Sequence, residues 1–99
     1  MNERSSEIVI FATARAASGM QAALEQAMRD VAHPTLAQPG CLGFELYRSK
    51  DGSAITAVER WASRVDHERH MQGAHVRALM GKFNGILSGA PTISEMEKL

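Results

Sequence analysis

The chain has 99 residues, with 11 basic and 11 acidic side chains and no net formal charge at pH 7. This length fits one domain, and so short a chain buries a smaller share of its surface than a larger protein does, which favours oligomers. The balanced charge supplies no basic field for nucleic acid or for an anionic membrane. Cys41 is the single cysteine, which excludes an internal disulfide and a cysteine-built zinc site.

The hydropathy of the chain gives no sign of a membrane segment. No apolar run approaches the roughly 18 residues of a membrane span, and the polar start MNERSSE does not resemble a signal peptide. We therefore expect a cytoplasmic protein with neither a nucleic-acid partner nor a membrane partner. Residues 1–6 are expected to be disordered, and residues 7–99 to form a single domain.

A β-strand is predicted from Glu7 to Arg15, because EIVIFATAR is rich in Ile, Val, Phe and Thr. Successive side chains of a strand point to opposite faces, and here both faces are mainly apolar. A strand of this kind is covered on both faces, which is more than a sheet with one solvated face requires.

A helix is predicted to follow. Ser18 is a candidate N-cap, with a glutamine three residues later in the capping-box position. Apolar residues recur at spacings of three and four from Met20 to Ala32, which is the period of an amphipathic helix. Pro34 disfavours helical geometry at the residue before it, so the helix is predicted to end or kink at His33.

A β-hairpin is predicted between Cys41 and Trp61. From Cys41 to Ser49 large apolar residues alternate with other residues, a period of two that is typical of a strand. The sequence KDGS then supplies a turn, since Gly52 tolerates a positive φ. The second strand runs from Ala54 to Trp61 and is rich in β-branched residues, which suit a pleated surface.

Helical segments are predicted after the hairpin. Ser63 is a candidate N-cap for a short segment that Gly73 interrupts, and a further helix is predicted from Ala74 to Leu87. The C-terminal sequence PTISEMEKL alternates weakly and predicts a last strand, at a sheet edge because its charged residues resist pairing with other chains.

The predicted order is strand, helix, strand, strand, helix, strand. This order predicts an α+β fold of the ferredoxin-like βαββαβ type, with a four-stranded antiparallel sheet and the helices on one face. The first strand, however, is apolar on both faces. A second copy of the same sheet is the economical cover for the other face, so we expect a homodimer.

Three sequence features together resemble a known family: PGCLGFELYRS, a strand ending in ERW, and a helix with DHERHMQGAHVRALM. They resemble the antibiotic biosynthesis monooxygenase domain family, and within it the quinol monooxygenase-like branch, from Glu7 to about Leu99. The resemblance implies a dimeric α+β barrel in which two sheets face each other. It also implies a cofactor-independent monooxygenase that oxidises a small phenolic or quinol substrate with molecular oxygen.

Other branches of the family set alternatives. The haem-degrading branch matches poorly, because Met80 stands where that branch carries its haem-ligating histidine, and His70 stands where it carries a tryptophan. We therefore expect no haem and no other cofactor. An isomerase or decarboxylase that uses the same pocket, and a non-catalytic dimeric module that binds a small aromatic molecule, remain open.

His70 and Glu59 are the candidate catalytic residues. An imidazole titrates near neutral pH, so His70 could take a proton from a bound phenol or hydroquinone, whose anion reacts with oxygen more readily. A purely structural role is the alternative, in which His70 bonds a group at the strand end such as Glu59. Glu59 and Trp61 share one face of their strand, and a buried carboxylate needs a partner or a cavity. As pure structure, Trp61 fills the core and Glu59 is its solvated neighbour.

Five residues are candidates for substrate binding: Trp61, His75, Ala57, Tyr47 and Met80. The small Ala57 leaves room on the face of Trp61, Tyr47 could line a cavity from the neighbouring strand, and methionine accepts flat aromatic rings. His75 lies five residues after the candidate catalytic histidine, so the two are not neighbours on an ideal helix.

The remaining histidine of this region, His67, is expected to be an exposed helix residue. His67 and His70 are three residues apart and could in principle share a metal ion. Two imidazoles without a third ligand are weak grounds for a site. We therefore expect no metal ion.

Overall fold

A computed structural model describes residues 7–99 of the chain, and the predicted disorder of residues 1–6 lies outside the described residues. The described part consists of four strands and three helices: β1 (Ile8–Arg15), α1 (Gln21–Leu36), β2 (Cys41–Arg48), β3 (Ala54–Trp61), α2 (Arg64–Met71), α3 (Ala74–Phe83) and β4 (Thr92–Met96). This order confirms the predicted elements. The second predicted helical region is divided at Gly73 into α2 and α3.

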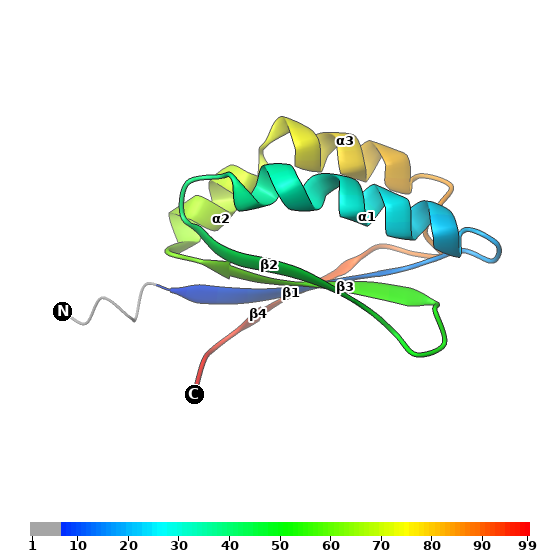
Figure 1. Cartoon of the computed structure of the whole chain (residues 1–99), viewed down its shortest axis with the longest axis horizontal. Helices are drawn as coiled ribbons and strands as arrows, with labels where there is room; N and C mark the ends of the chain where they lie inside the picture. Colours follow the sequence, from blue (N-terminus) through cyan, green and yellow to red (C-terminus); the bar gives the residue numbers. More distant parts are fainter. Residues whose placement is uncertain (1–6) are drawn as a thin grey trace.

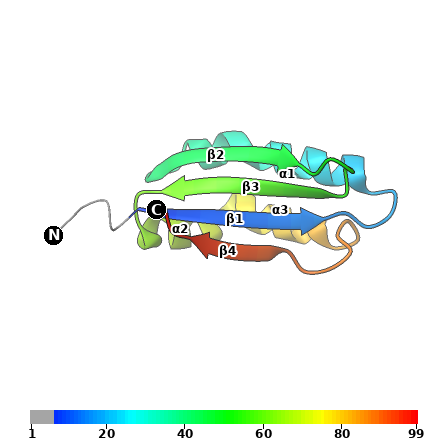
Figure 2. The ribbon, with the colours of Figure 1, turned by 90° about the horizontal axis from the view of Figure 1, so that it is seen from below.

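The strands form one antiparallel sheet in the order β2-β3-β1-β4. All three helices lie on one face of this sheet (Figure 1), and the opposite face is uncovered when the chain is seen from below (Figure 2). The predicted α+β ferredoxin-like fold is therefore confirmed. The last strand, β4, lies at an edge beside β1, as its charged residues predict.

The core lies between the helices and the face of the sheet that they cover, which we call the inner face. On β1 this face carries Ile8, Ile10, Ala12 and Ala14, in agreement with the period of two. The register pairs Ile10 with Glu59, which brings a carboxyl group into an otherwise apolar layer. The inner face is therefore where a functional site would be built.

The start of α1 differs from its prediction. Ser18 does not cap the helix: the cap position is Met20, without a side-chain hydrogen bond. Gly19 has a φ of +81°, a left-handed conformation that glycine adopts at little cost, and it turns the chain between the predicted cap and the helix. The backbone N–H of Met20 then bonds the carbonyl of Ala17 at 2.9 Å.

The predicted end of α1 at His33 is wrong, because the helix continues through Pro34 to Leu36. A proline near the C-terminal end removes only one helical hydrogen bond. The additional turn buries Thr35 completely against the rest of the core. Tertiary packing thus outweighs the local preference of the residue before proline.

The later helices confirm one prediction and correct another. Ser63 caps α2, since its Oγ accepts the backbone N–H of Asp66 at 3.2 Å. The last helix, predicted to reach Leu87, ends at Phe83. Asn84 leaves helical geometry with a ψ of 117°, and Gly85 has a φ of +88°, so this pair turns the chain toward the sheet.

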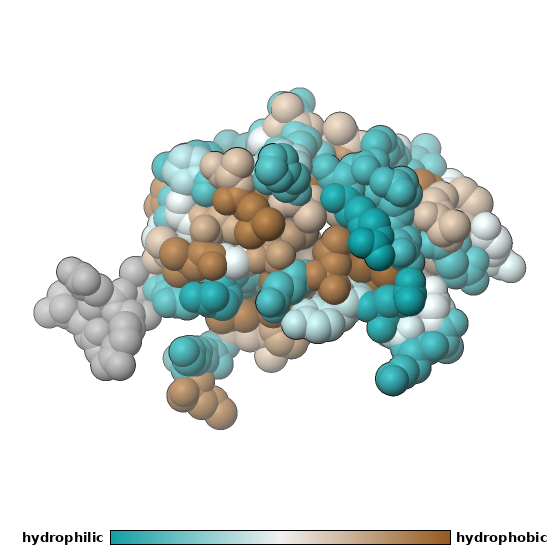
Figure 3. All heavy atoms as spheres, viewed as in Figure 1, coloured by the Kyte–Doolittle hydropathy of each residue, from teal (hydrophilic) through white to brown (hydrophobic). Residues whose placement is uncertain are grey.

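The uncovered face of the sheet, which we call the outer face, carries several apolar side chains. Phe11 lies near its centre on β1 and is 38% exposed, and Tyr47 on β2 is 56% exposed. Val9, Val58 and Met96 share this face. Hydrophobic atoms are visible below the sheet and along the seam between sheet and helices (Figure 3). Among residues 7–99 no helix is both long enough and apolar enough to cross a membrane.

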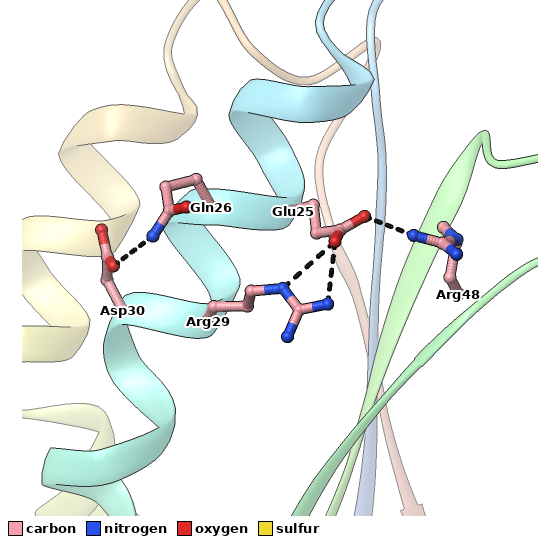
Figure 4. Close-up of polar contacts among 5 residues, drawn as sticks. All are labelled: Glu25, Gln26, Arg29, Asp30 and Arg48. Carbon is pink, nitrogen blue, oxygen red and sulfur yellow. Dashed lines mark hydrogen bonds and ion pairs between the residues drawn. The ribbon is translucent and has the colours of Figure 1, made fainter.

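A small charged network joins α1 to the end of β2 (Figure 4). Glu25 accepts from Arg29 at 2.9 Å and from Arg48 at 2.6 Å, and these two hydrogen bonds lower the pKa of its carboxyl group. The neighbouring amide of Gln26 donates to Asp30 at 2.7 Å. All these groups are exposed and solvent-screened, so the network is a modest fastening of helix to sheet.

Candidate functional site

A cavity of about 50 Å³ lies between the inner face of the sheet and the helices. Its walls are almost entirely apolar side chains from the sheet and from α1 and α3, including Ile10, Ala12, Met28, Val31, Leu79 and Phe83. Three polar side chains, Glu59, His67 and His70, line the same cavity. The site is therefore an apolar pocket with a few ionisable groups, which is the usual composition of a small-molecule site.

Glu59 lies on β3 and is only 4% exposed. The strand period places its carboxyl group beside Trp61, whose indole Nε1–H donates to Oε1 at 3.0 Å. Burial raises the pKa of Glu59 to about 7, and the indole hydrogen bond opposes this shift only in part. The carboxyl group therefore changes its charge close to neutral pH.

His70 lies near the end of α2 and is also only 4% exposed. Its Nδ1 lies 2.6 Å from Oε1 of Gln38, and because an amide oxygen only accepts, Nδ1 carries the proton. Its Nε2 is then the free base and lies 3.7 Å from Oε1 of Glu59. Burial, and to a smaller extent His67 and His75, lower the pKa of His70 to about 4, so the imidazole is neutral at pH 7.

Trp61 and His75 support this pair from outside the cavity. Trp61 is fully buried and its ring centroid lies 4.7 Å from that of His70. His75 lies 5.6 Å from His70, centroid to centroid, although five residues separate them, because Gly73 breaks the helix between them. The Nε2 of His75 lies 3.2 Å from the Oγ1 of buried Thr35. Neither Trp61 nor His75 lines the cavity itself.

The other three predicted binding residues are separated by the sheet. Ala57 is 1% exposed and lines the cavity, where its small side chain leaves space. Met80 lines it from α3 and is 39% exposed, so it stands at the opening. Tyr47 lies on the outer face and its hydroxyl donates to Glu45 at 3.0 Å, so the structure does not bring it to the cavity.

Two lining residues were missed or set aside by the sequence analysis. Phe44 lies on β2 with its side chain on the inner face, opposite to Tyr47. His67 was expected to be exposed, but it is partly buried and its Nε2 is inaccessible to solvent. The spacing of three between His67 and His70 was the available signal, because it places both imidazoles on one side of α2.

The arrangement supplies a proton acceptor in a dry, apolar space. Above pH 7 the site contains an ionised Glu59 beside a neutral His70. The other charged groups nearby are tied up elsewhere, since Glu95 of β4 is held by Arg64 at 2.6 Å. Among residues 7–99 no group of three or more His, Cys, Asp or Glu side chains is arranged to hold a metal ion.

Comparison with known proteins gives one family match and one curated sequence match. The sequence model of the family described as antibiotic biosynthesis monooxygenase matches residues 7–82. A Mycobacterium tuberculosis protein named "Putative monooxygenase Rv0793" is 36% identical over 53 residues, which are 50% of this chain and 52% of that protein. This sequence match thus spans about half of the length of the relative.

Solved structures share the fold over nearly the whole chain. The crystal structure of PA3566 from Pseudomonas aeruginosa has a TM-score of 0.91 and 26% identity, and covers 99% of both chains. The structure of Rv0793 from Mycobacterium tuberculosis has a TM-score of 0.89 and 23% identity, and covers 95% of this chain and 96% of that one. The second likeness, at its low identity, concerns the fold alone.

Proposed function

Because the chain belongs to the antibiotic biosynthesis monooxygenase family, we propose that it is a cofactor-independent monooxygenase that oxidises a small phenolic or quinol substrate with molecular oxygen. One observation carries the proposal: a buried carboxyl group with a pKa of about 7 lies beside a neutral imidazole at an apolar cavity. Such a group is suited to take the proton of a weakly acidic hydroxyl near neutral pH.

The proton acceptor in this proposal is Glu59, with His70 as its neighbour. A phenolic hydroxyl has a pKa of about 10, so transfer to a group with a pKa near 7 costs about 4 kcal/mol. Transfer to His70, with a pKa of about 4, would cost about 8 kcal/mol. The difference of about 4 kcal/mol favours Glu59 by roughly a thousandfold. His70 then holds the carboxylate in place and receives a proton only in concert with it.

The chemistry balances with oxygen as the only co-reactant. The substrate hydroxyl loses its proton to Glu59, and the anion gives one electron to oxygen. The two radicals combine to form a C–O bond, the O–O bond breaks, and water leaves. One oxygen atom enters the quinone product and the other becomes water, so a phenol and one O₂ give a quinone and one H₂O. The apolar walls exclude solvent from the reactive anion.

The size of the cavity restricts the substrate class. A space of about 50 Å³ would hold roughly four water molecules. This is enough for a single ring after small side-chain movements, and Met80 at the opening can make room because methionine is flexible. We therefore propose a one-ring substrate in preference to a polycyclic one.

The pH dependence of oxygen consumption tests this function. With a panel of one-ring hydroquinones, kcat is expected to rise with pH up to a plateau above about pH 7, because Glu59 accepts a proton only after losing its own. The measurement is oxygen uptake in an electrode between pH 5 and 9, corrected for the uncatalysed oxidation of each compound at the same pH.

Other outcomes identify the competing functions. Absence of oxygen uptake with every compound would contradict the monooxygenase assignment. Turnover that persists without oxygen would indicate an isomerase or decarboxylase that uses the same proton acceptor, and ligand-induced thermal stabilisation without product would indicate a binding module. A rate limb near pH 4 instead of pH 7 would make His70 the base.

We also propose that the protein is a homodimer joined through the outer face. Phe11, Val58 and Met96 form an apolar stretch across three neighbouring strands there (Figure 2), and sheets that are apolar on both faces are normally covered on both. A two-fold partner presents the same surface in return, so the apolar side chains of both copies are buried together.

A charge at the centre of the outer face is expected to separate the dimer. Phe11→Glu should sediment mainly as a monomer of 10.8 kDa at micromolar concentration, because burying an unpaired carboxylate is costly. The matched control is Val65→Glu on α2, where the side chain is 60% exposed and away from the sheet; this variant should keep the mass of the wild type. A monomeric wild-type protein in analytical ultracentrifugation would overturn the proposal.

A further inference from the structure

One polar atom of the cavity has no partner within the described residues. The Nε2 of His67 is buried and makes no hydrogen bond, and it is the buried side-chain nitrogen or oxygen of residues 7–99 that is left unsatisfied. Its two polar neighbours in the cavity are already engaged: His70 bonds Gln38, and Glu59 accepts from Trp61. A buried polar group without a partner lowers stability, so this atom is a candidate for binding a ligand.

The position of His67 relates it to the proposed reaction. Its ring centroid lies 6.0 Å from that of His70 and 6.1 Å from that of Trp61, on the same side of α2. The cavity therefore has its three polar side chains grouped, with Glu59 and His70 on one side of the group and His67 on another. A ligand that reaches Glu59 with one hydroxyl would have a second part of its ring near His67.

The charge state of His67 also suits a neutral oxygen. Burial lowers the pKa of its imidazole, and the neighbouring Glu95, Glu68 and Arg64 shift it less. The ring is neutral at pH 7, so it has one N–H donor and one nitrogen acceptor, which matches a hydroxyl or a carbonyl oxygen. Neither a carboxylate nor an ammonium group is favoured by this neutral ring.

We propose that His67 is a specificity-determining residue whose Nε2 hydrogen-bonds a second oxygen substituent of the substrate ring, so that the site selects dihydroxylated rings over rings with one hydroxyl. The inference rests on the proposed function in using the same cavity as the substrate site. It concerns ligand selection, however, and so it can be tested by binding alone, without oxygen and without turnover.

The experiment measures anaerobic binding of phenol, catechol, resorcinol and hydroquinone at pH 7. Trp61 is the one tryptophan of the chain and lies beside the polar group, so its fluorescence serves as a probe, with calorimetry as confirmation. Wild-type protein is expected to bind at least one dihydroxybenzene about tenfold tighter than phenol, which corresponds to 1.4 kcal/mol. His67→Phe keeps a ring of similar shape and should bring this ratio close to one. His67→Gln offers an amide at a similar reach and should restore part of it.

The control variant is His33→Phe, which makes the same substitution at an exposed histidine of α1 outside the cavity. It should leave the ratio unchanged. His67→Phe should also unfold at the same denaturant concentration as wild type or a higher one, because it removes an unsatisfied buried atom.

Two results would overturn the inference. The first is an unchanged preference in His67→Phe, or wild-type protein that binds none of the dihydroxybenzenes more tightly than phenol. The second is a His67→Phe variant that is less stable and weaker toward all four compounds alike, which would indicate a structural role. If wild-type protein binds selectively but consumes no oxygen, the proposed reaction fails while the role of His67 in selection stands.

Discussion

Glu59→Gln is expected to lower kcat for quinol oxidation by about 10²- to 10⁴-fold, which is the usual contribution of a general base. Glutamine has nearly the same shape as glutamate and its amide oxygen can still accept the Trp61 N–H, so the walls of the cavity are preserved. It cannot accept a proton from the substrate. The rise of activity around pH 7 should disappear together with the rate, as measured by oxygen uptake across the pH range.

The stability of this variant provides its folding control. In the native protein Glu59 keeps its proton up to about pH 7, whereas in the unfolded chain it loses the proton near pH 4.5. The native state therefore binds more protons between these values, so this group makes the wild type less stable as pH rises from 4.5 to 7. Glu59→Gln lacks this loss and should be at least as stable as the wild type at pH 8, by urea unfolding.

Glu45→Gln is the matched control for activity. Glu45 lies on the outer face of the same sheet, where it accepts the hydroxyl of Tyr47. The same chemical change there should leave kcat and its pH dependence unaffected. Wild-type rates in Glu59→Gln would remove Glu59 from the reaction, because no other group would then be needed to explain the limb near pH 7.

Trp61→Ala is expected to lower the free energy of unfolding by about 3–5 kcal/mol. Trp61 is fully buried, and its removal leaves a void beneath His70 and takes away the indole donor that holds Glu59. The loss of that hydrogen bond should raise the pKa of Glu59 further, since the indole bond is the one interaction that lowers it. Urea unfolding followed by circular dichroism measures the stability.

Trp61→Phe separates the two contributions of the indole. Phenylalanine restores most of the buried apolar surface without the N–H donor, so it should recover much of the lost stability. The rate limb near pH 7 should nevertheless move to higher pH, because the carboxylate remains without its donor. If Trp61→Phe had the same pH profile as wild type, the indole would be a packing residue without influence on Glu59.

The pattern of the sequence predicted the elements because their apolar periods are strong and local. The strand between Ala54 and Trp61 was predicted with its observed bounds, and the period of two placed Glu59 and Trp61 on one face. The errors lie at helix ends, where Ser18 does not cap and Pro34 does not terminate α1. These boundaries depend on long-range burial, such as that of Thr35, which local propensity does not contain.

The candidate site shows the same division. The sequence indicated Glu59, His70 and Ala57, whose positions follow from strand register and helix spacing. It placed Tyr47 in the pocket and His67 in solvent, and the structure has the reverse arrangement. Which face of the sheet the helices cover, and how deeply the first turn of α2 is buried, are not local properties of either residue.

The amino-acid sequence by itself thus determined the order of the elements and the faces on which their side chains lie, because both follow from backbone geometry with periods of 2 and 3.6 residues. Only the tertiary structure decided the chemistry of the site. The pKa values of Glu59 and His70 are set by burial between sheet and helices, and desolvation depends on atoms that are distant in sequence and meet only after folding.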